Sequence, residues 1–240
     1  MINNETEVKV LKVVKDPQLS LKRFSQYIVA TQAGKMRIVE GSKYPGDYIP
    51  RFYEMARKVI CDFFSANFED HGVYYEEFKR QAVVFRKEAT AYESNRDPYK
   101  NRMCSADGLD QMTAMSTVLA PILDRYILNS NLTQRRSSIT RSGLKIGAMA
   151  DMLLFDNAGA TQVGFLKFNF TKKVLSKNEA ATMLFVLGKY FEKQGLELDP
   201  QACFLVDVFA WRVYVAANQP NIEQLADAAC MEVVRTWDLV

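Results

Sequence analysis

The sequence predicts an α/β fold in which helices flank a mixed β-sheet, with a mostly helical N-terminal part. Apolar side chains recur at helical spacing through residues 51–68. Two β-prone stretches, 145–155 and 162–170, flank the turn-forming residues 157–159, and this arrangement predicts a hairpin. The composition, 48% hydrophobic and 25% charged over 240 residues, is typical of a globular protein and excludes collagen-like, mucin-like and disordered classes.

The N-terminal half is predicted to consist of helices joined by polar connections. Residues 7–14 alternate imperfectly and predict a strand, and Ser20 is placed to cap a short helix through Ile28. The expected order then is a loop at 41–50, helices at 51–68 and 73–92, a loop at 93–109, and a helix at 110–129 with a kink at Pro121. We therefore expect residues 1–133 to be mostly helical.

After residue 133 the pattern changes to short strands. Ser176 and Glu179 have the spacing of a capping box, which begins a helix that Gly195 ends. The expected order is β-β-β-α-β-β-α, with strands at 137–140, 145–155, 162–170, 203–209 and 212–217 and a last helix from Pro220. Residues 134–240 are thus predicted to form the α/β core, packed with the N-terminal part as one compact unit.

The net charge of +3 is distributed unevenly along the chain. Residues 134–177 contain eight basic and two acidic residues, whereas residues 178–240 contain four basic and nine acidic ones. A basic face of this kind suits phosphate. The alternative is that the basic segments pack beside acidic ones within the same molecule, and the sequence leaves both open.

Cysteine usage and hydropathy bear on the location of the chain. The four cysteines form no C-x-x-C pair and match no zinc-binding spacing, so we expect reduced thiols. The N-terminal residues have no secretory pattern, which predicts a cytoplasmic protein. The apolar runs are too short to span a bilayer, so no membrane partner is expected. Phosphate-loop, dinucleotide-binding and nucleophile-elbow motifs are absent from the sequence.

One stretch of the core resembles a known family. The segment Lys145-Ile-Gly-Ala-Met-Ala-Asp151-Met-Leu-Leu-Phe-Asp156-Asn-Ala-Gly159, followed by Val163-Gly-Phe165-Leu-Lys167-Phe-Asn169-Phe, resembles the core of the PD-(D/E)XK nuclease superfamily, in its RecB-like branch. The resemblance covers about 100 residues and implies a restriction-endonuclease-like sheet. It also implies a metal-dependent nuclease site in which a first acid precedes an acid-x-Lys triplet on the next strand.

Mapped residue by residue, the family's site is incomplete in this chain. Asp151 takes the first acid position and Lys167 the lysine position, but Phe165 stands where the second acid belongs. Two carboxylates would hold Mg²⁺, which prefers oxygen ligands, and the lysine would stabilise developing charge. Phenylalanine supplies no ligand, so Asp151 is left as the one metal-binding candidate and the site is degenerate. Mg²⁺ is expected only if the chain is catalytic.

The second acid has alternative positions. Glu179 on the following helix is one, although the capping box already gives it a structural role. Asp207 on a later strand is another, unless it is a strand-end acid paired with Arg212. Asp151, Lys167 and Glu179 are therefore the catalytic candidates. The alternative for Asp151 and Lys167 is a buried pair between neighbouring strands, because burying one charge without the other is costly.

Six basic residues are candidates for nucleic-acid binding. Three precede the Asp151 strand and three follow the Lys167 strand, so a hairpin is expected to bring them to the same end of the sheet: Arg135, Arg136, Arg141, Lys172, Lys173 and Lys177. The last three also lie near a helix N-terminus, which favours anions. The alternative is a solvated turn whose lysines keep the loop soluble.

Together these features predict a nucleic-acid-associated accessory protein with a catalytically degenerate nuclease-like core, in a defence or repair system, with a protein partner or oligomer. One alternative is an active Mg²⁺-dependent nuclease with a displaced carboxylate. Another is a protein-assembly subunit that binds no nucleic acid.

Overall fold

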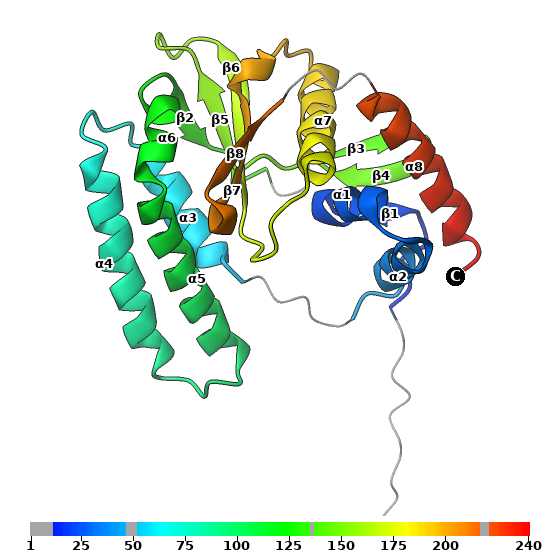
Figure 1. Ribbon diagram of the computed structural model, residues 1–240, viewed down its shortest axis with the longest axis horizontal. Coiled ribbons are helices and arrows are strands. Elements are labelled where there is room, and N and C mark those ends of the chain that lie inside the picture. Colours follow the sequence, from blue (N-terminus) through cyan, green and yellow to red (C-terminus); the bar gives the residue numbers. More distant parts are fainter. Residues whose placement is uncertain (1–11, 47–51, 135–136, 217–220) are drawn as a thin grey trace, which may run out of the picture.

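The computed structural model describes residues 12–46, 52–134, 137–216 and 221–240. Within these ranges the chain has the mixed α/β fold that the sequence predicts (Figure 1). The helices are α1 (Leu21–Val29), α2 (Gln32–Lys43), α3 (Glu54–Phe64), α4 (Gly72–Ala89), α5 (Asp97–Ala114), α6 (Ser116–Leu123), α7 (Lys177–Lys193) and α8 (Ile222–Trp237), with 3-10 turns η1 (Pro200–Ala202) and η2 (Val208–Ala210). The strands are β1 (Gln18–Leu19), β2 (Ile127–Ser130), β3 (Ser138–Arg141), β4 (Leu144–Gly147), β5 (Met152–Phe155), β6 (Gln162–Asn169), β7 (Cys203–Asp207) and β8 (Arg212–Val215).

The larger sheet has five strands in the order β2-β5-β6-β7-β8. The predicted hairpin is confirmed, because β5 and β6 pair antiparallel with Met152 opposite Leu166. Helix α7 then crosses over to β7, which is parallel to β6, and Asn169 lies beside Asp207 where both strands end. Parallel strands need such a crossover, and the capping box of Ser176 and Glu179 begins its helix as predicted.

The predicted strand at 145–155 is wrong in its extent. Its first part is β4, which belongs to a separate three-stranded sheet in the order β1-β4-β3, and its last part is β5 in the larger sheet. The chain changes partners over residues 148–151. Ala148 N–H still donates to the carbonyl of Ser137, directly before β3 of the smaller sheet, at 2.9 Å. Asp151 N–H instead donates to the carbonyl of Leu166 in the larger sheet, at 3.0 Å. Asp151 therefore lies where the chain enters the larger sheet.

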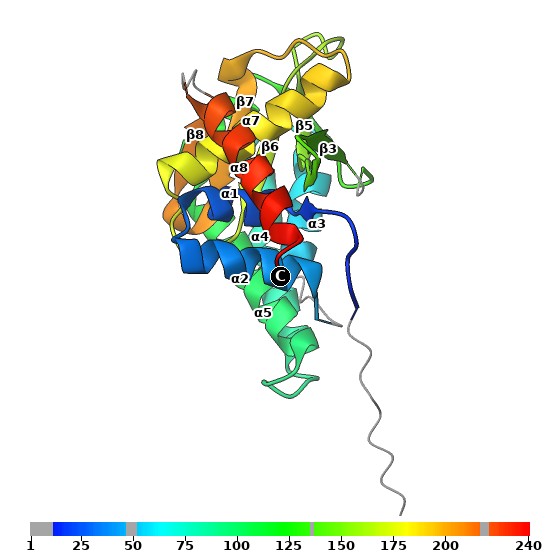
Figure 2. The same cartoon turned by 90° about the vertical axis from the view of Figure 1, so that its right-hand side faces the viewer.

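Two hydrophobic cores lie on opposite faces of the larger sheet. One contains apolar side chains of α3–α6, and the other contains those of α1, α2, α7 and α8. Along β6, Leu166 and Phe168 belong to the first core and Phe165 to the second, as strand alternation requires. Helices α3–α6 lie to the left of the larger sheet in Figure 1 and α1 and α7 to its right, and α8 lies across α7 and α2 (Figure 2). Both cores include residues from before and after position 133.

Two helices occupy stretches that were not predicted to be helical. Helix α2, capped by the Thr31 side chain, runs into the predicted loop at 41–50 as far as Lys43. Helix α5 begins at Asp97, inside the predicted loop at 93–109. Pro98 is compatible with this helix because it lies in the first turn, where its missing N–H costs little. Gly108 lets α5 approach closely, since a Cβ there would lie 3.2 Å from the Phe170 ring.

The remaining expectations are partly met. The predicted helix at 110–129 ends earlier, because α6 stops at Leu123 and 127–130 is strand β2. Residues 12–14 of the strand predicted at 7–14 form no strand, and the rest of that stretch lies outside the described residues. None of the helices in the described ranges has the length and apolar character that crossing a membrane requires.

Candidate functional site

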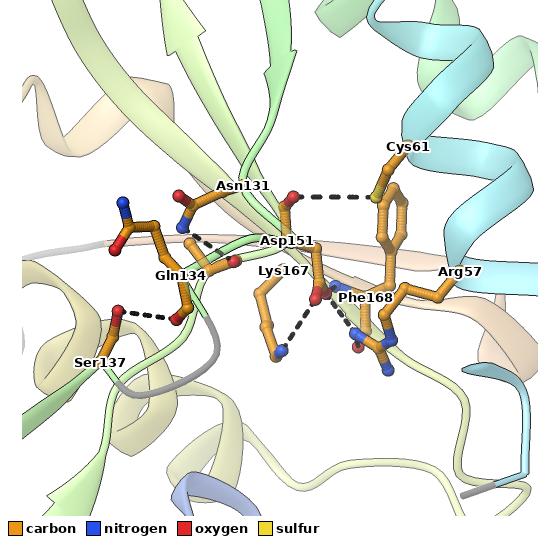
Figure 3. A network of polar contacts seen from close by, with 9 residues as sticks. Arg57, Cys61, Asn131, Gln134, Ser137, Asp151, Lys167 and Phe168 are labelled. Carbon is orange, nitrogen blue, oxygen red and sulfur yellow. Dashed lines mark hydrogen bonds and ion pairs between the residues drawn. The ribbon is translucent and has the colours of Figure 1, made fainter.

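Asp151 is the centre of a buried ion network (Figure 3). Its side chain is 0% exposed. Lys167 Nζ on β6 donates to Oδ1 at 3.0 Å. Arg57 Nη1 on α3 donates to Oδ2 at 2.5 Å, and the backbone N–H of Phe168 donates to the same oxygen at 2.7 Å. The structure thus brings Asp151 and Lys167 together, as the buried-pair alternative expects, and adds a second cation.

The network sets the protonation states of its members. Burial by itself would raise the pKa of Asp151, but Arg57, Lys167 and the Phe168 N–H together hold it below its usual value. Burial lowers the pKa of Lys167, and the attraction of Asp151 opposes that change. The carboxylate is therefore ionised, and two neighbouring cations neutralise it.

Phe165 fills the position that the family's second acid would occupy. Its side chain is 0% exposed and its ring stacks on Phe191 of α7, with ring centroids 5.5 Å apart. Because Phe165 and Lys167 are two residues apart on one strand, they lie on the same face of the sheet. The place of a metal ligand is therefore part of the second core.

These residues do not fit Mg²⁺. Both oxygens of Asp151 already accept hydrogen bonds, one from Lys167 and the other from Arg57 and a backbone N–H. Over the described part of the chain, no group of three or more His, Cys, Asp and Glu side chains is placed to hold a metal ion. A divalent cation beside Asp151 would also have to displace Arg57, because the guanidinium already supplies the positive charge that the buried carboxylate needs.

Glu179 and Asp207 each have structural partners. Glu179 accepts hydrogen bonds from the backbone N–H and the hydroxyl of Ser176, at 2.8 and 2.7 Å, which completes the capping box. Asp207 accepts from Asn169 Nδ2 at 2.8 Å and from the Leu175 N–H at 2.9 Å. Arg212 faces Asp207 in the β7–β8 ladder, but its side chain is exposed. Asp207 therefore holds the loop that follows β6.

The six basic candidates divide into three groups. Arg135 and Arg136 lie outside the described residues. Arg141 on β3 binds Asp227 and Glu223 of α8, the latter at 2.7 Å, so its charge holds α8 against the smaller sheet. Lys172, Lys173 and Lys177 are exposed, in the loop after β6 and at the start of α7.

The structure reveals a basic groove that the sequence did not indicate. Two cavities of about 460 and 1230 Å³ adjoin, since both are lined by Ser20, Phe52, Ser137 and Gly147. The side chains around them include two carboxylates, Glu54 and Asp97, and seven cations: Lys12, Lys22, Arg23, Arg57, Arg102, Lys145 and Lys167. We call these two cavities the basic groove, and the ion network lies at its inner end.

Arg57 connects the ion network to a row of aromatic rings. Its guanidinium lies over the Phe170 ring at 5.3 Å, and Phe170 stacks on Tyr53 with centroids 5.3 Å apart. Tyr53 meets Phe209 of η2 edge to face at 5.7 Å, and Lys172 Nζ lies 5.9 Å from the Phe209 ring. This row joins the buried carboxylate to the exposed turn between β7 and β8.

Arg57 is the site residue that the sequence did not reveal. It lies within the helix that the sequence predicts, four residues before the buried Cys61, and a single arginine on a long amphipathic helix normally faces solvent. Its partner is 94 residues away in the chain. Local sequence carries no signal for such a pairing.

The site has to be interpreted from its own geometry, since no protein-family model, no curated protein and no solved structure matches this chain. That geometry is a neutralised buried carboxylate at the inner end of a basic groove, with a row of aromatic rings leading to exposed lysines.

Proposed function

We propose that this chain is a nucleic-acid-binding accessory protein, built on a nuclease-like core that does not cleave, which serves a larger defence or repair assembly. The observation that carries the proposal is the state of Asp151. Arg57, Lys167 and the Phe168 N–H saturate the one carboxylate that occupies a metal-ligand position, and they do so inside a basic groove.

The topology around Asp151 supports the nuclease-like part of the proposal. Asp151 lies directly before the first strand of a hairpin and Lys167 lies on the second, and a crossover helix leads from this second strand to a parallel one. This is the arrangement that the resemblance to PD-(D/E)XK nucleases implies for the first acid and the lysine. Phe165 departs from that pattern and packs into the core.

The charge of the basic groove supports the nucleic-acid part. Seven cationic side chains and two carboxylates line the groove, and two further carboxylates, Asp151 and Glu88, pair with some of these cations. Seven positive charges against four negative ones still leave an excess of positive charge. Clefts with such an excess concentrate polyanions, and phosphate contacts supply most sequence-independent affinity for nucleic acid. Lys172, Lys173 and Lys177 are exposed in the loop after β6 and at the start of α7, and Thr171 of that loop lines the groove.

The test combines a binding and a cleavage assay on the full chain. We expect labelled DNA or RNA to be retained at low salt, with affinity that falls steeply as salt rises, and no cleavage with Mg²⁺ or Mn²⁺. Lys12→Ala with Lys145→Ala, both in the groove, should weaken binding and reduce the salt dependence. Lys58→Ala is the matched control, since Lys58 is exposed on α3 and paired with Asp62.

Two outcomes would contradict the proposal. Metal-dependent cleavage that Asp151→Ala abolishes would show an active nuclease. Failure to bind any nucleic acid at low salt, together with a stable complex or oligomer, would show an assembly subunit.

A further inference from the structure

Trp211 stands out among the exposed side chains of the described residues. It follows η2 at the turn into β8, and 55% of its surface is exposed. Its backbone is left-handed, with φ 53° and ψ 43°. For a bulky residue this conformation costs on the order of 1–2 kcal/mol, whereas glycine adopts it without strain. A large aromatic side chain is therefore displayed at a position whose backbone favours glycine.

The indole ring is also fixed in place. Its Nε1–H donates to Oε1 of Gln111 on α5 at 2.8 Å. The partners are 100 residues apart in the chain, so the bond ties the turn to a rigid helix. An exposed ring that is held this way loses little freedom when it binds a flat partner.

Basic residues lie on the chain segments next to this ring. Strands β6 and β7 are parallel and end in register at Asn169 and Asp207, so the segments that follow them leave the sheet at the same edge. The first segment carries Lys172 and Lys173, and the second leads through η2 to Trp211. Lys172 Nζ lies 5.9 Å from the ring of Phe209, two residues before Trp211, and exposed Arg212 follows it.

We propose that Trp211 is a base-stacking platform for single-stranded nucleic acid, with Lys172 and Lys173 contacting the flanking phosphates. The inference rests on the proposed nucleic-acid binding and specifies the form of the ligand. A flat aromatic ring beside cations matches a chain of alternating bases and phosphates. Single strands fit because their bases offer free faces, whereas the bases of a duplex are stacked on one another.

The chain itself supplies the probe for a test. It contains two tryptophans, and the second, Trp237, is 1% exposed. Titration with oligodeoxythymidine of about 15 nucleotides should quench the fluorescence of Trp211 and leave that of Trp237 unchanged. Trp211→Phe should abolish the quenching and keep affinity within about fivefold, because a ring remains to stack.

Trp211→Gly is the decisive variant, because glycine suits the backbone and the variant is expected to fold. We expect affinity for the oligonucleotide to fall roughly 5- to 100-fold with an unchanged salt slope, since stacking is lost but no charge is removed. Lys172→Ala with Lys173→Ala should instead reduce the salt slope. Phe68→Ala is the control, since Phe68 is 41% exposed in the loop between α3 and α4 and its ring packs on Tyr74.

The outcomes separate this inference from the proposed function. The stacking platform alone is overturned if the protein binds nucleic acid and Trp211→Gly leaves that binding unchanged. It is also overturned if the protein binds a duplex more tightly than the single strand. No binding to any nucleic acid overturns both proposals. A change in oligomeric state on Trp211→Gly, with nucleic-acid binding unchanged, would show that the ring contacts protein instead.

Discussion

Arg57 and Asp151 are 94 residues apart in the chain, yet their side chains form an ion pair of 2.5 Å in which the carboxylate is fully buried. Arg57 comes from the helical N-terminal half and Asp151 from the entrance to the larger sheet. The pair therefore links α3 to the point where the chain enters the larger sheet. The consequence is a buried carboxylate that takes one of its two cationic partners from a helix far away in the chain.

The ion network should contribute strongly to stability. Asp151→Asn leaves Arg57 and Lys167 without their counter-charge, and we expect the free energy of unfolding to fall by about 3–5 kcal/mol. Arg57→Met removes one of the two cations and should cost about 1–3 kcal/mol, because Lys167 remains. Urea denaturation measures both. Lys58→Ala on the same helix should change the free energy of unfolding by less than about 1 kcal/mol, because this surface pair is exposed. If Lys58→Ala destabilised the protein as much as Asp151→Asn does, the ion network would not be a special source of stability.

Acid should weaken the protein partly through Asp151. Its pKa is lowered in the folded state, so its stabilising contribution is complete above the unfolded value of about 3.9 and is lost as the pH falls through the lower folded value. Urea midpoints measured from pH 6 down to about pH 3 should therefore decrease less in Asp151→Asn than in the wild type. Parallel curves for the two proteins would mean that the pKa of Asp151 does not differ between the folded and unfolded states.

Replacing glycine by alanine should change the stability of the protein in opposite directions at Gly164 and Gly188. At Gly164 on β6 a Cβ would lie 1.9 Å from the carbonyl oxygen of Ala202, so Gly164→Ala should cost at least about 3 kcal/mol or prevent folding. At Gly188 on α7 a Cβ has no neighbour within 4 Å, so Gly188→Ala should stabilise the helix by about 0.5–1 kcal/mol. Thermal and urea unfolding measure both changes. Equal effects at the two positions would contradict the close packing of β6 against η1.

Arg141 and the lysines after β6 should behave differently in binding assays. Arg141→Ala removes the ion pairs to Asp227 and Glu223, so we expect about 1 kcal/mol of lost stability and an unchanged affinity for nucleic acid. Replacing Lys172 and Lys173 by alanine should reduce the salt slope of binding by about 0.7–0.9 for each phosphate that is no longer neutralised. A reduced slope for Arg141→Ala instead would place the nucleic acid on the smaller sheet.

Thiol reactivity tests the expectation of reduced cysteines in the core. Cys104 is partly exposed, whereas Cys61, Cys203 and Cys230 are buried. Burial raises the pKa of Cys203 and of Cys230 to about 12 and also raises that of Cys61. Iodoacetamide should therefore modify Cys104 first in the native protein, as peptide mass spectrometry would show. Early modification of a buried thiol would indicate local opening.

Several features of the site could be predicted because they depend on neighbours in sequence. The capping box joins residues three apart, and the hairpin of β5 and β6 joins strands across one short turn. Phe165, two residues before Lys167, is an apolar residue on a buried strand, and the sequence shows it directly. Each of these depends on local geometry, so a short window of sequence contains the information.

What the sequence alone determined is the α/β class, the hairpin of the strand that follows Asp151 with the strand that carries Lys167, and the apolar residue two positions before Lys167. Tertiary structure decided that Arg57 pairs with Asp151, that Arg141 binds α8, that the chain changes sheets at 148–151, and that the exposed Trp211 ring is held by Gln111. The physical reason is distance along the chain. These contacts join residues that only the packing of both cores brings together, and a buried charge takes whichever partner that packing places within reach.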